Sequence, residues 1–446
     1  MTTTAFVDVT VVPMDSERLL EGQTVVVADG RIAAIGPVAA VAVPDGAAPI
    51  DGRGRFLMPG LADMHVHYNE PSFAALLLAH GVTTVRNMWG FPIHVEAREQ
   101  IKRGEGFGPW IYTCGPIMDG NPPVWPASTV IETAEEAERS VAEQLEQGYD
   151  FLKVYGNLSR DAYDAIIAAG RKHGIRVVGH VPAHVGLQYA LGAGQASIEH
   201  LNGYLQAIVR DGAPEATGML TERMIQWTEC ADEANISEIV SATVEAGAWN
   251  CVTMIVSRKL AAARLAFDEE RKRPELRYLS PQYITSWDPQ NDFRQQGDIN
   301  LDRAAVAFQR AGELRRLLVR ALRDAGARLL LGSDTPNPFV IPGVAIHDEL
   351  AMLVEAGLTP YEAIRAGTRD AAEFLGALDA FGTVAEGLRA DLILTEGNPL
   401  DDVSNVAKRA GVMVRGRWLP AEELNAMLEQ VATEAATGQS HHDHAP

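Results

Sequence analysis

Short apolar runs of strand character alternate with helical segments between about Leu57 and Gly382, and this alternation constrains the fold more than any other feature. The expected strands lie near 57–66, 82–88, 110–115, 151–155, 176–180, 196–200, 251–256 and 329–334. Eight strands that alternate with helices predict an α/β fold, a (β/α)₈ TIM barrel. The alternative is an open, doubly wound sheet, but no glycine-rich phosphate-binding sequence follows the first strand.

Both ends of the chain have a different sequence pattern, which is typical of short strands joined by turns. The β-rich runs Gln23–Ala28 and Arg31–Gly36 flank the pair Asp29-Gly30, which is a strong hairpin signal. Further strand-like runs follow at 390–395 and 411–414. Since neither end is long enough to close a core of its own, we expect the two ends to pair in one small domain.

These patterns define a domain organisation. We expect a small β-sandwich shared by both chain ends, a barrel between them, an inserted subdomain or lid over the site, and a flexible tail that carries three of the twelve histidines. The sandwich covers 1–57 and 383–435, the barrel 58–382, the insertion 258–300 and the tail 436–446.

Composition excludes several classes of function. The net charge of −21 would repel phosphate backbones, which argues against nucleic acid or an anionic membrane as a partner. No run approaches eighteen consecutive apolar residues, so we expect no membrane span. Three widely spaced cysteines suggest no disulfide framework, and the start lacks the pattern of a signal peptide. We therefore expect a cytoplasmic protein (or an exported one, if a leader has been removed) with a small-molecule substrate; a homo-oligomer stays open.

Residues that bind metal ions stand at the ends of several expected strands. The first strand ends in His65-Val66-His67, and because side chains alternate along a strand, both imidazoles face the same way about 7 Å apart. The other such residues are Lys153, His180, His200 and Asp334. The carboxyl ends of barrel strands converge on one mouth, so the pattern predicts a metal site there.

Lys153 is the least ordinary of these residues. It lies in the apolar strand Phe151–Tyr155, where an unpaired ammonium group is costly and needs a strong partner or a changed chemical state. Cys114, at the end of the third strand, is interpreted as a small buried hydrophobic residue rather than a nucleophile.

The chain resembles the amidohydrolase superfamily of metal-dependent hydrolases. The resemblance rests on four motifs, Pro59–His67, Ser197–His200, Leu331–Pro336 and Gly382–Leu392, and covers nearly the whole chain. Within the superfamily the sequence looks most like the imidazolonepropionase-related and prolidase-like branch. Lys153 favours the binuclear, dipeptidase-like members of that branch.

The resemblance implies a role for each strand-end residue. His65, His67 and Asp334 would hold one metal ion, and His180 and His200 the other. Lys153, carboxylated by CO₂, would bridge two divalent ions, for which Zn²⁺ is the best fit and Mn²⁺, Fe²⁺ or Co²⁺ also suit the ligands. A bridging hydroxide would attack the amide bond of a dipeptide or N-acyl amino acid. Asp334 would act as catalytic base and return the proton to the leaving amine.

Other functions stay open at this stage. The same two-metal centre hydrolyses esters, lactones, carbamates or phosphotriesters, while a heterocycle deaminase or a catalytically silent scaffold fits the residues less well. Candidate substrate contacts follow the ligand strands: Tyr155, His184, Asn202 and Tyr204. Three tryptophans are candidates for an aromatic pocket wall: Trp89, Trp110 and Trp125.

Overall fold

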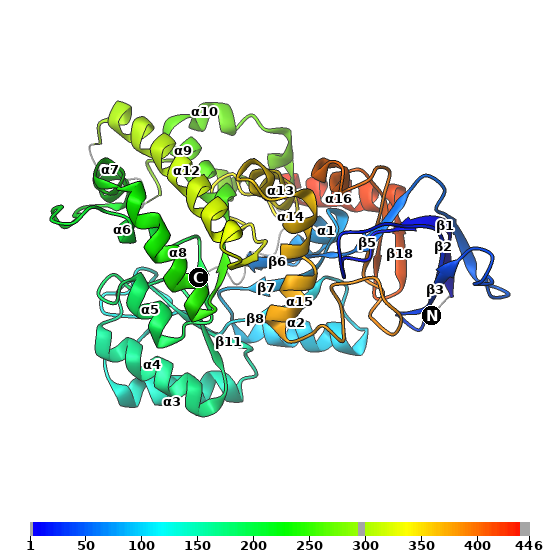
Figure 1. The fold of residues 1–446 in the computed structure, drawn as a ribbon, viewed down its shortest axis with the longest axis horizontal. Helices are drawn as coiled ribbons and strands as arrows, with labels where there is room; N and C mark the ends of the chain where they lie inside the picture. The colour runs from blue at the N-terminus through cyan, green and yellow to red at the C-terminus, as the bar shows by residue number, and fades with distance from the viewer. Residues whose placement is uncertain (1–2, 293–298, 438–446) are drawn as a thin grey trace.

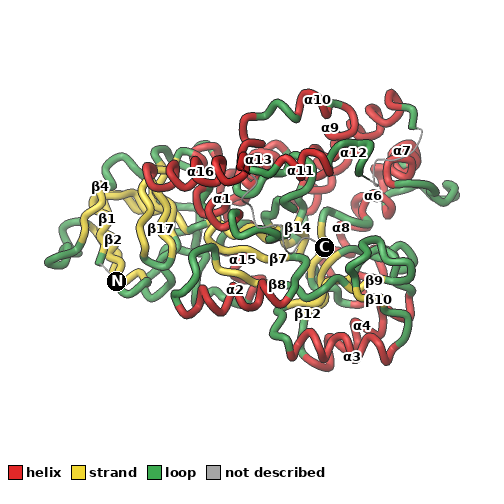
Figure 2. The backbone as a smooth tube through the Cα atoms, turned by 180° about the vertical axis from the view of Figure 1, so that it is seen from behind, coloured by secondary structure: helices red, strands yellow, loops and turns green. Residues whose placement is uncertain are grey.

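Eight parallel strands form the centre of the protein in a computed structural model, which describes residues 3–292 and 299–437. Helices surround these strands (Figures 1 and 2). The barrel strands are β6 (Leu61–Val66), β7 (Val82–Asn87), β8 (Trp110–Thr113), β11 (Phe151–Val154), β12 (Arg176–Gly179), β13 (Ser197–Glu199), β14 (Trp249–Cys251) and β15 (Arg328–Leu330).

The strands close into a ring through two seams. At one seam, Cys114 after β8 pairs in parallel with Phe151 of β11. At the other, Val66 of β6 pairs in parallel with Thr335, which follows β15. The predicted α/β barrel is therefore visible in the strand pairing.

Strands from both ends of the chain form a second, eight-stranded sheet, and Figure 1 shows the first strands beside β18. Its members are β1 (Thr4–Val11), β2 (Leu20–Ala28), β3 (Arg31–Pro37), β4 (Ala48–Asp51), β5 (Phe56–Pro59), β16 (Leu392–Thr395), β17 (Arg409–Val414) and β18 (Arg417–Pro420). The shared terminal sheet agrees with the sequence prediction. Its division into two stacked layers, as in a sandwich, stays a prediction, and so do the domain boundaries.

Helices follow most of the barrel strands, and the last helix follows the final strand of the terminal sheet. They are α1 (Phe73–Ala79), α2 (Pro92–Arg103), α3 (Ala134–Glu146), α4 (Arg160–His173), α5 (Leu187–Ala193), α6 (Tyr204–Ala207), α7 (Leu220–Cys230), α8 (Ile236–Ala246), α9 (Met254–Leu265), α10 (Phe267–Glu270), α11 (Pro281–Ser286), α12 (Leu301–Asp324), α13 (Val344–Glu355), α14 (Pro360–Ala366), α15 (Arg369–Leu375) and α16 (Ala421–Thr437). Two short strands, β9 (Met118–Asp119) and β10 (Thr129–Val130), and 3₁₀ turns at Glu233–Asn235, Pro274–Tyr278 and Val403–Ala407 complete the described elements.

One predicted strand is wrong in its limits. The sequence suggested a strand over 251–256, but β14 ends at Cys251 and α9 begins at Met254. A short apolar run does not distinguish a buried strand from a buried helix start. Thr253, in the left-handed conformation with φ 41°, separates the two elements.

The predicted insertion over 258–300 consists largely of short helices, and its residues 293–298 lie outside the described part. Two of its aromatic side chains pack on segments that follow the barrel strands. The Tyr283 ring lies 6.3 Å from that of Phe73, and the Trp287 ring lies 5.5 Å from that of Phe339. A role as a lid stays a prediction. The tail residues 438–446 also lie outside the described part.

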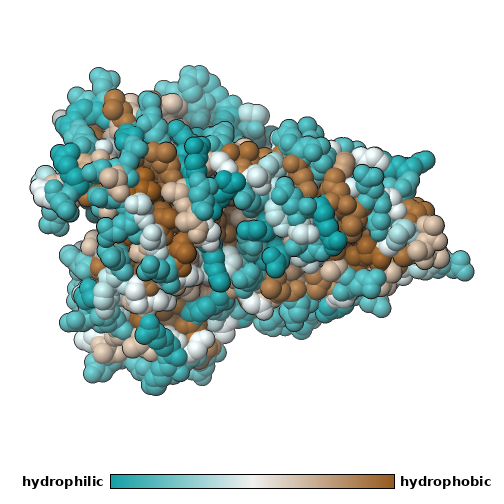
Figure 3. Space-filling view, viewed as in Figure 1, coloured by the Kyte–Doolittle hydropathy of each residue, from teal (hydrophilic) through white to brown (hydrophobic). Residues whose placement is uncertain are grey.

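In the view of Figure 3, hydrophilic side chains cover much of the surface and hydrophobic residues show between them. Among the described residues, no helix combines the length and the apolar character that a membrane crossing requires. Cys114 is completely buried and has no disulfide partner, which confirms its interpretation as a core residue.

A half-buried cluster of two histidines and an arginine joins the barrel to the terminal sheet. The His347 imidazole lies 3.1 Å from the carbonyl of His80, and Arg409 Nη1 lies 3.0 Å from His347 Nε2. His80 Nδ1 contacts the carbonyl of Leu76 at 2.8 Å. Burial, together with the positive charge of Arg409, lowers the pKa of His347 well below 6.5 and that of His80 to about 4.

This cluster predicts a loss of stability in acid. The unfolded chain binds protons at both imidazoles near pH 6.5, whereas the folded chain does so only at lower pH, so stability is lost as the pH falls from 6.5 towards 4. The melting temperature should therefore fall less between about pH 7.5 and pH 5 in His80→Asn than in the wild type. His184→Asn, at an exposed histidine, is the matched control and should follow the wild type. The same pH dependence in His80→Asn and wild type would contradict this assignment.

Candidate metal centre

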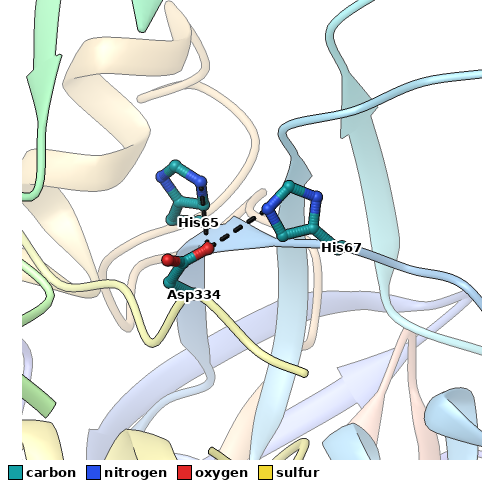
Figure 4. Close-up of side chains that lie close together, drawn as sticks. All are labelled: His65, His67 and Asp334. Atoms are coloured by element: carbon teal, nitrogen blue, oxygen red, sulfur yellow. Dashed lines mark ion pairs between the residues drawn. The ribbon is translucent and has the colours of Figure 1, made fainter. Parts of the chain in front are cut away.

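Three predicted metal ligands meet across the seam between β6 and the segment that follows β15. His65 Nε2 lies 3.3 Å from Asp334 Oδ1, and His67 Nε2 lies 3.2 Å from the same oxygen. Figure 4 shows both imidazoles directed at this carboxylate. One ligand atom from each of the three side chains lies within 4.8 Å of the other two, which is close enough for one metal ion.

The seam is built by backbone contacts. Asp334 N donates to the carbonyl of His65 at 2.7 Å, and His67 N donates to the carbonyl of Thr335 at 2.7 Å. Asp334 itself adopts φ 60°, a conformation uncommon for a residue with a side chain. Gly332 allows the close approach, because a Cβ there would lie 2.5 Å from Cys251 Sγ and 2.9 Å from His65 N.

The remaining predicted ligands lie beside this group. The rings of His65 and His200 are 4.4 Å apart, and those of His180 and His200 are 5.0 Å apart. His200 Nδ1 lies 3.7 Å from Asp334 Oδ2. Lys153, almost completely buried in β11, experiences the charge of Asp334 as well. The structure thus gathers all six predicted strand-end residues in one region.

The protonation states suit metal binding. Burial lowers the pKa values of His65, His180 and His200, which keeps these imidazoles neutral. Burial also lowers the pKa of Lys153, although Asp334 opposes that shift. Burial alone would raise the pKa of Asp334, but the neighbouring histidines outweigh it and hold this carboxyl below its usual range.

Two buried ligand atoms without hydrogen-bond partners indicate that these residues fit a divalent cation. His65 Nε2 and Asp334 Oδ1 are buried and have no hydrogen-bond partner. Two such atoms facing each other leave a polar pair that hydrogen bonds do not satisfy, which is costly without a further group. Nitrogen and carboxylate oxygen atoms are the ligands that Zn²⁺ and related ions accept.

A fully buried ion pair below the ligands was missed by the sequence analysis. Arg86 Nη2 donates to both Glu199 oxygens, at 3.0 and 2.8 Å, and Glu199 Oε2 lies 2.8 Å from His65 Nδ1. Arg86 Nε also donates to the carbonyl of Met64 at 2.6 Å. The carboxylate therefore accepts the Nδ1 proton of His65 and leaves Nε2 to face the metal position.

A signal for this pair was present in the sequence. Arg86 is a charged residue inside the strand β7, which is buried along its whole length, just as Lys153 is in β11. Thr253 was missed as well: its Oγ1 lies 2.6 Å from His200 Nδ1 and supports that ring. No sequence pattern marks such a contact, since Thr253 lies 53 residues from His200.

The predicted substrate contacts are placed differently from one another. The Tyr155 ring stacks on that of His180, with centroids 4.0 Å apart, and His184 is exposed on the loop after β12. Asn202 Oδ1 accepts a hydrogen bond from Val181 N at 2.9 Å. Tyr204 has no exposed surface.

The Tyr204 hydroxyl bonds to Thr243 and Asn250 at 2.9 and 2.8 Å. Its polar atom is therefore used within the core, and we do not retain it as a substrate contact. Trp110, which we grouped with Trp89 and Trp125, is the first residue of β8 and so lies at the opposite end of that strand from the strand-end residues. Arg389 Cζ lies 4.8 Å from the centroid of its ring.

Comparison with known proteins places this geometry in a family. Residues 56–419 match the amidohydrolase family, and the chain belongs to it. Ochratoxinase from Aspergillus niger is 24% identical over 412 residues, which cover 78% of this chain and 71% of that protein. Adenine deaminase from Paracoccus denitrificans is 39% identical over only 79 residues, 17% of this chain; the match spans 13% of that relative's length.

Solved structures show the same fold. Bottromycin amidohydrolase superposes with a TM-score of 0.75 at 27% identity, over 97% of this chain and 90% of that one. A Xaa-Pro dipeptidase with bound methionine in its active site gives a TM-score of 0.69 at 19% identity, over 94% of this chain and 100% of that one. The chain is thus a member of the amidohydrolase family, and its His65, His67 and Asp334 side chains form a candidate metal site.

The ion pair below the site predicts a loss of metal affinity in Glu199→Gln. The neutral amide accepts the Nδ1 proton of His65 less strongly, so we expect metal affinity to fall about 10- to 100-fold. Competition with a chromophoric chelator measures it. Asp391→Asn is the matched control, because it alters another buried carboxylate–arginine pair, with Arg389, just before β16 of the terminal sheet. Unchanged affinity in Glu199→Gln would show that Glu199 does not orient His65.

Proposed function

We propose that this protein is a binuclear hydrolase that cleaves the amide bond of a dipeptide or an N-acyl amino acid. The observation that carries the proposal is the meeting of His65, His67 and Asp334 at the strand ends, where His65 Nε2 and Asp334 Oδ1 are buried without a hydrogen-bond partner. The similarity to bottromycin amidohydrolase and to a Xaa-Pro dipeptidase supports an amide-cleaving chemistry.

The ligands divide into two sets around Lys153. His65, His67 and Asp334 would hold one cation, most suitably Zn²⁺. His180 and His200 would hold a second. Two cations in this position would lower the pKa of a bound water and would act as a Lewis acid on the scissile carbonyl.

Lys153 would join the two sets as a carbamate. The neutral Nζ amine adds to the carbon of CO₂, so an N–C bond forms, one C–O π bond becomes a carboxylate, and one proton leaves the nitrogen. The lowered pKa of Lys153 supports this reaction, because only the neutral amine is a nucleophile. The product is an anion, which replaces a costly buried ammonium with a ligand for both cations.

Asp334 would move the proton. It lies between His67 and His200 and stays ionised because these imidazoles hold its pKa low. As an anion it accepts the proton of the attacking water and delivers it to the nitrogen of the leaving amine. Tyr155, His184 and Asn202 remain proposed substrate contacts around the same strand ends.

Ester or lactone hydrolysis is the main competing activity, and a substrate screen separates it from amide hydrolysis. The Zn²⁺-loaded protein is incubated with dipeptides, N-acyl amino acids and aryl esters, and product formation is followed by chromatography. We expect turnover of at least one amide class. Turnover of esters alone, or of none of these compounds, would contradict the proposal.

Asp334→Asn tests the proton-transfer role. The amide oxygen still binds a cation but accepts a proton poorly, so we expect kcat to fall about 10²- to 10⁴-fold while bound metal is retained. Metal content is measured by plasma mass spectrometry on the same samples. Full activity with retained metal would exclude Asp334 as the base.

A further inference from the structure

Half-buried aromatic side chains lie next to one another beside the candidate metal centre. The Trp89 ring lies 6.3 Å from that of His67, and the rings of Phe91 and Trp125 each lie 5.8 Å from that of Trp89. All of these side chains retain partial exposure. We call Trp89, Phe91, Trp125 and Tyr155 the aromatic wall.

The wall reaches from one set of metal ligands to the other. Trp125 Nε1 donates to the Tyr155 hydroxyl at 3.0 Å. The Tyr155 ring in turn stacks on that of His180, with 4.0 Å between centroids and 25° between planes. The row of contacts thus starts at His67 and ends at His180, so a substrate held between the two sets lies beside it.

Buried polar groups fix the half of the wall that carries Trp125. Asp119 is completely buried, and its carboxylate accepts hydrogen bonds from three backbone amides. These are the amides of Gly120 at 2.9 Å, Val124 at 2.8 Å and Asn157 at 2.7 Å. These three hydrogen bonds connect the loop before Trp125 to the segment that follows β11, the strand that carries Lys153.

A second buried set fixes the other half. The Asn87 side chain accepts from Tyr68 N at 2.9 Å and donates to the carbonyl of Trp89 at 3.0 Å. His94 Nδ1 accepts from Phe91 N at 2.9 Å. Both ends of the wall are therefore held by side chains that are themselves buried.

This arrangement points to a ligand. Large aromatic side chains gain free energy when they are buried, and their rings pair with other planar rings in stacked or edge-to-face geometry. Here they stay partly exposed, held in place in advance, beside the ligands of the candidate centre. Preorganised apolar surface with a few polar groups is typical of small-molecule sites.

We propose that the aromatic wall binds a planar aromatic ring carried by the substrate on one side of the scissile amide. The inference rests on the proposed amidohydrolase function and specifies its substrate class: N-aroyl amino acids or dipeptides that contain an aromatic residue. Trp89 and Trp125 are the specificity-determining residues, because they form the central contact of the wall.

Two substrate pairs, each differing only in the ring, test the proposal. The Zn²⁺-loaded wild type is assayed with N-benzoylglycine against N-acetylglycine, and with glycyl-phenylalanine against glycyl-alanine. We expect kcat/KM to favour the aromatic member at least about tenfold in one pair. Glycyl-lysine is included because a cation also binds ring faces. A preference for the lysine substrate, or for neither, would overturn the proposal.

Variants locate the preference on the wall. Trp89→Ala and Trp125→Ala should each lose about tenfold in kcat/KM for the aromatic substrate and change little for its aliphatic counterpart. Trp125→Phe, which keeps a ring, should retain most of the preference and covers the case in which Trp125→Ala does not fold. Trp227→Ala, on α7, is the matched control and should behave as wild type. An equal loss for both members of a pair would exclude a role in specificity.

A binding measurement separates this inference from the proposed function. Titration calorimetry with metal-loaded Asp334→Asn should show tighter binding of N-benzoylglycine than of N-acetylglycine. Amide turnover without aromatic preference would reject the wall's role and leave the hydrolase function intact. Preferential binding of the aromatic compound, with no turnover of any amide by the wild type, would reject the proposed hydrolase function instead.

Discussion

The hydrogen bonds across the seam between β6 and the segment after β15 are the constraint on which the site depends. They join the backbones of residues 65 and 67 to those of residues 334 and 335. Because both histidines belong to one strand end and Asp334 to the facing segment, barrel closure and assembly of the candidate metal site are the same event. Gly332 makes this possible, since any larger residue there would press against Cys251 and His65.

Buried charge is the second constraint, and it is balanced locally. Glu199 is completely buried between Arg86 and His65, so its negative charge is paired while it orients an imidazole. Lys153 and Asp334 occupy the same interior, where the charge of Asp334 raises the pKa of Lys153 against the effect of burial. Burial of this many ionisable groups costs desolvation free energy that an apolar core would not cost. We attribute their presence to the proposed metal chemistry at the strand ends.

Sequence periodicity was enough to predict the barrel, the shared terminal sheet and the six strand-end residues, because each depends on local pattern and on the rule that strand ends converge. Periodicity failed at 251–256, where a short apolar run fits both strand and helix. It also could not pair Arg86 with Glu199, or place Tyr204 in the core, because these contacts join elements distant along the chain.

The proposed two-cation centre requires Lys153, which would join the two ligand sets. The most direct test is the metal content of Zn²⁺-loaded protein, prepared with bicarbonate, in the wild type and in Lys153→Met, which replaces the amine with an apolar side chain of similar length. We expect about two ions per chain in the wild type and one or fewer in the variant. One ion per chain in both proteins would contradict it.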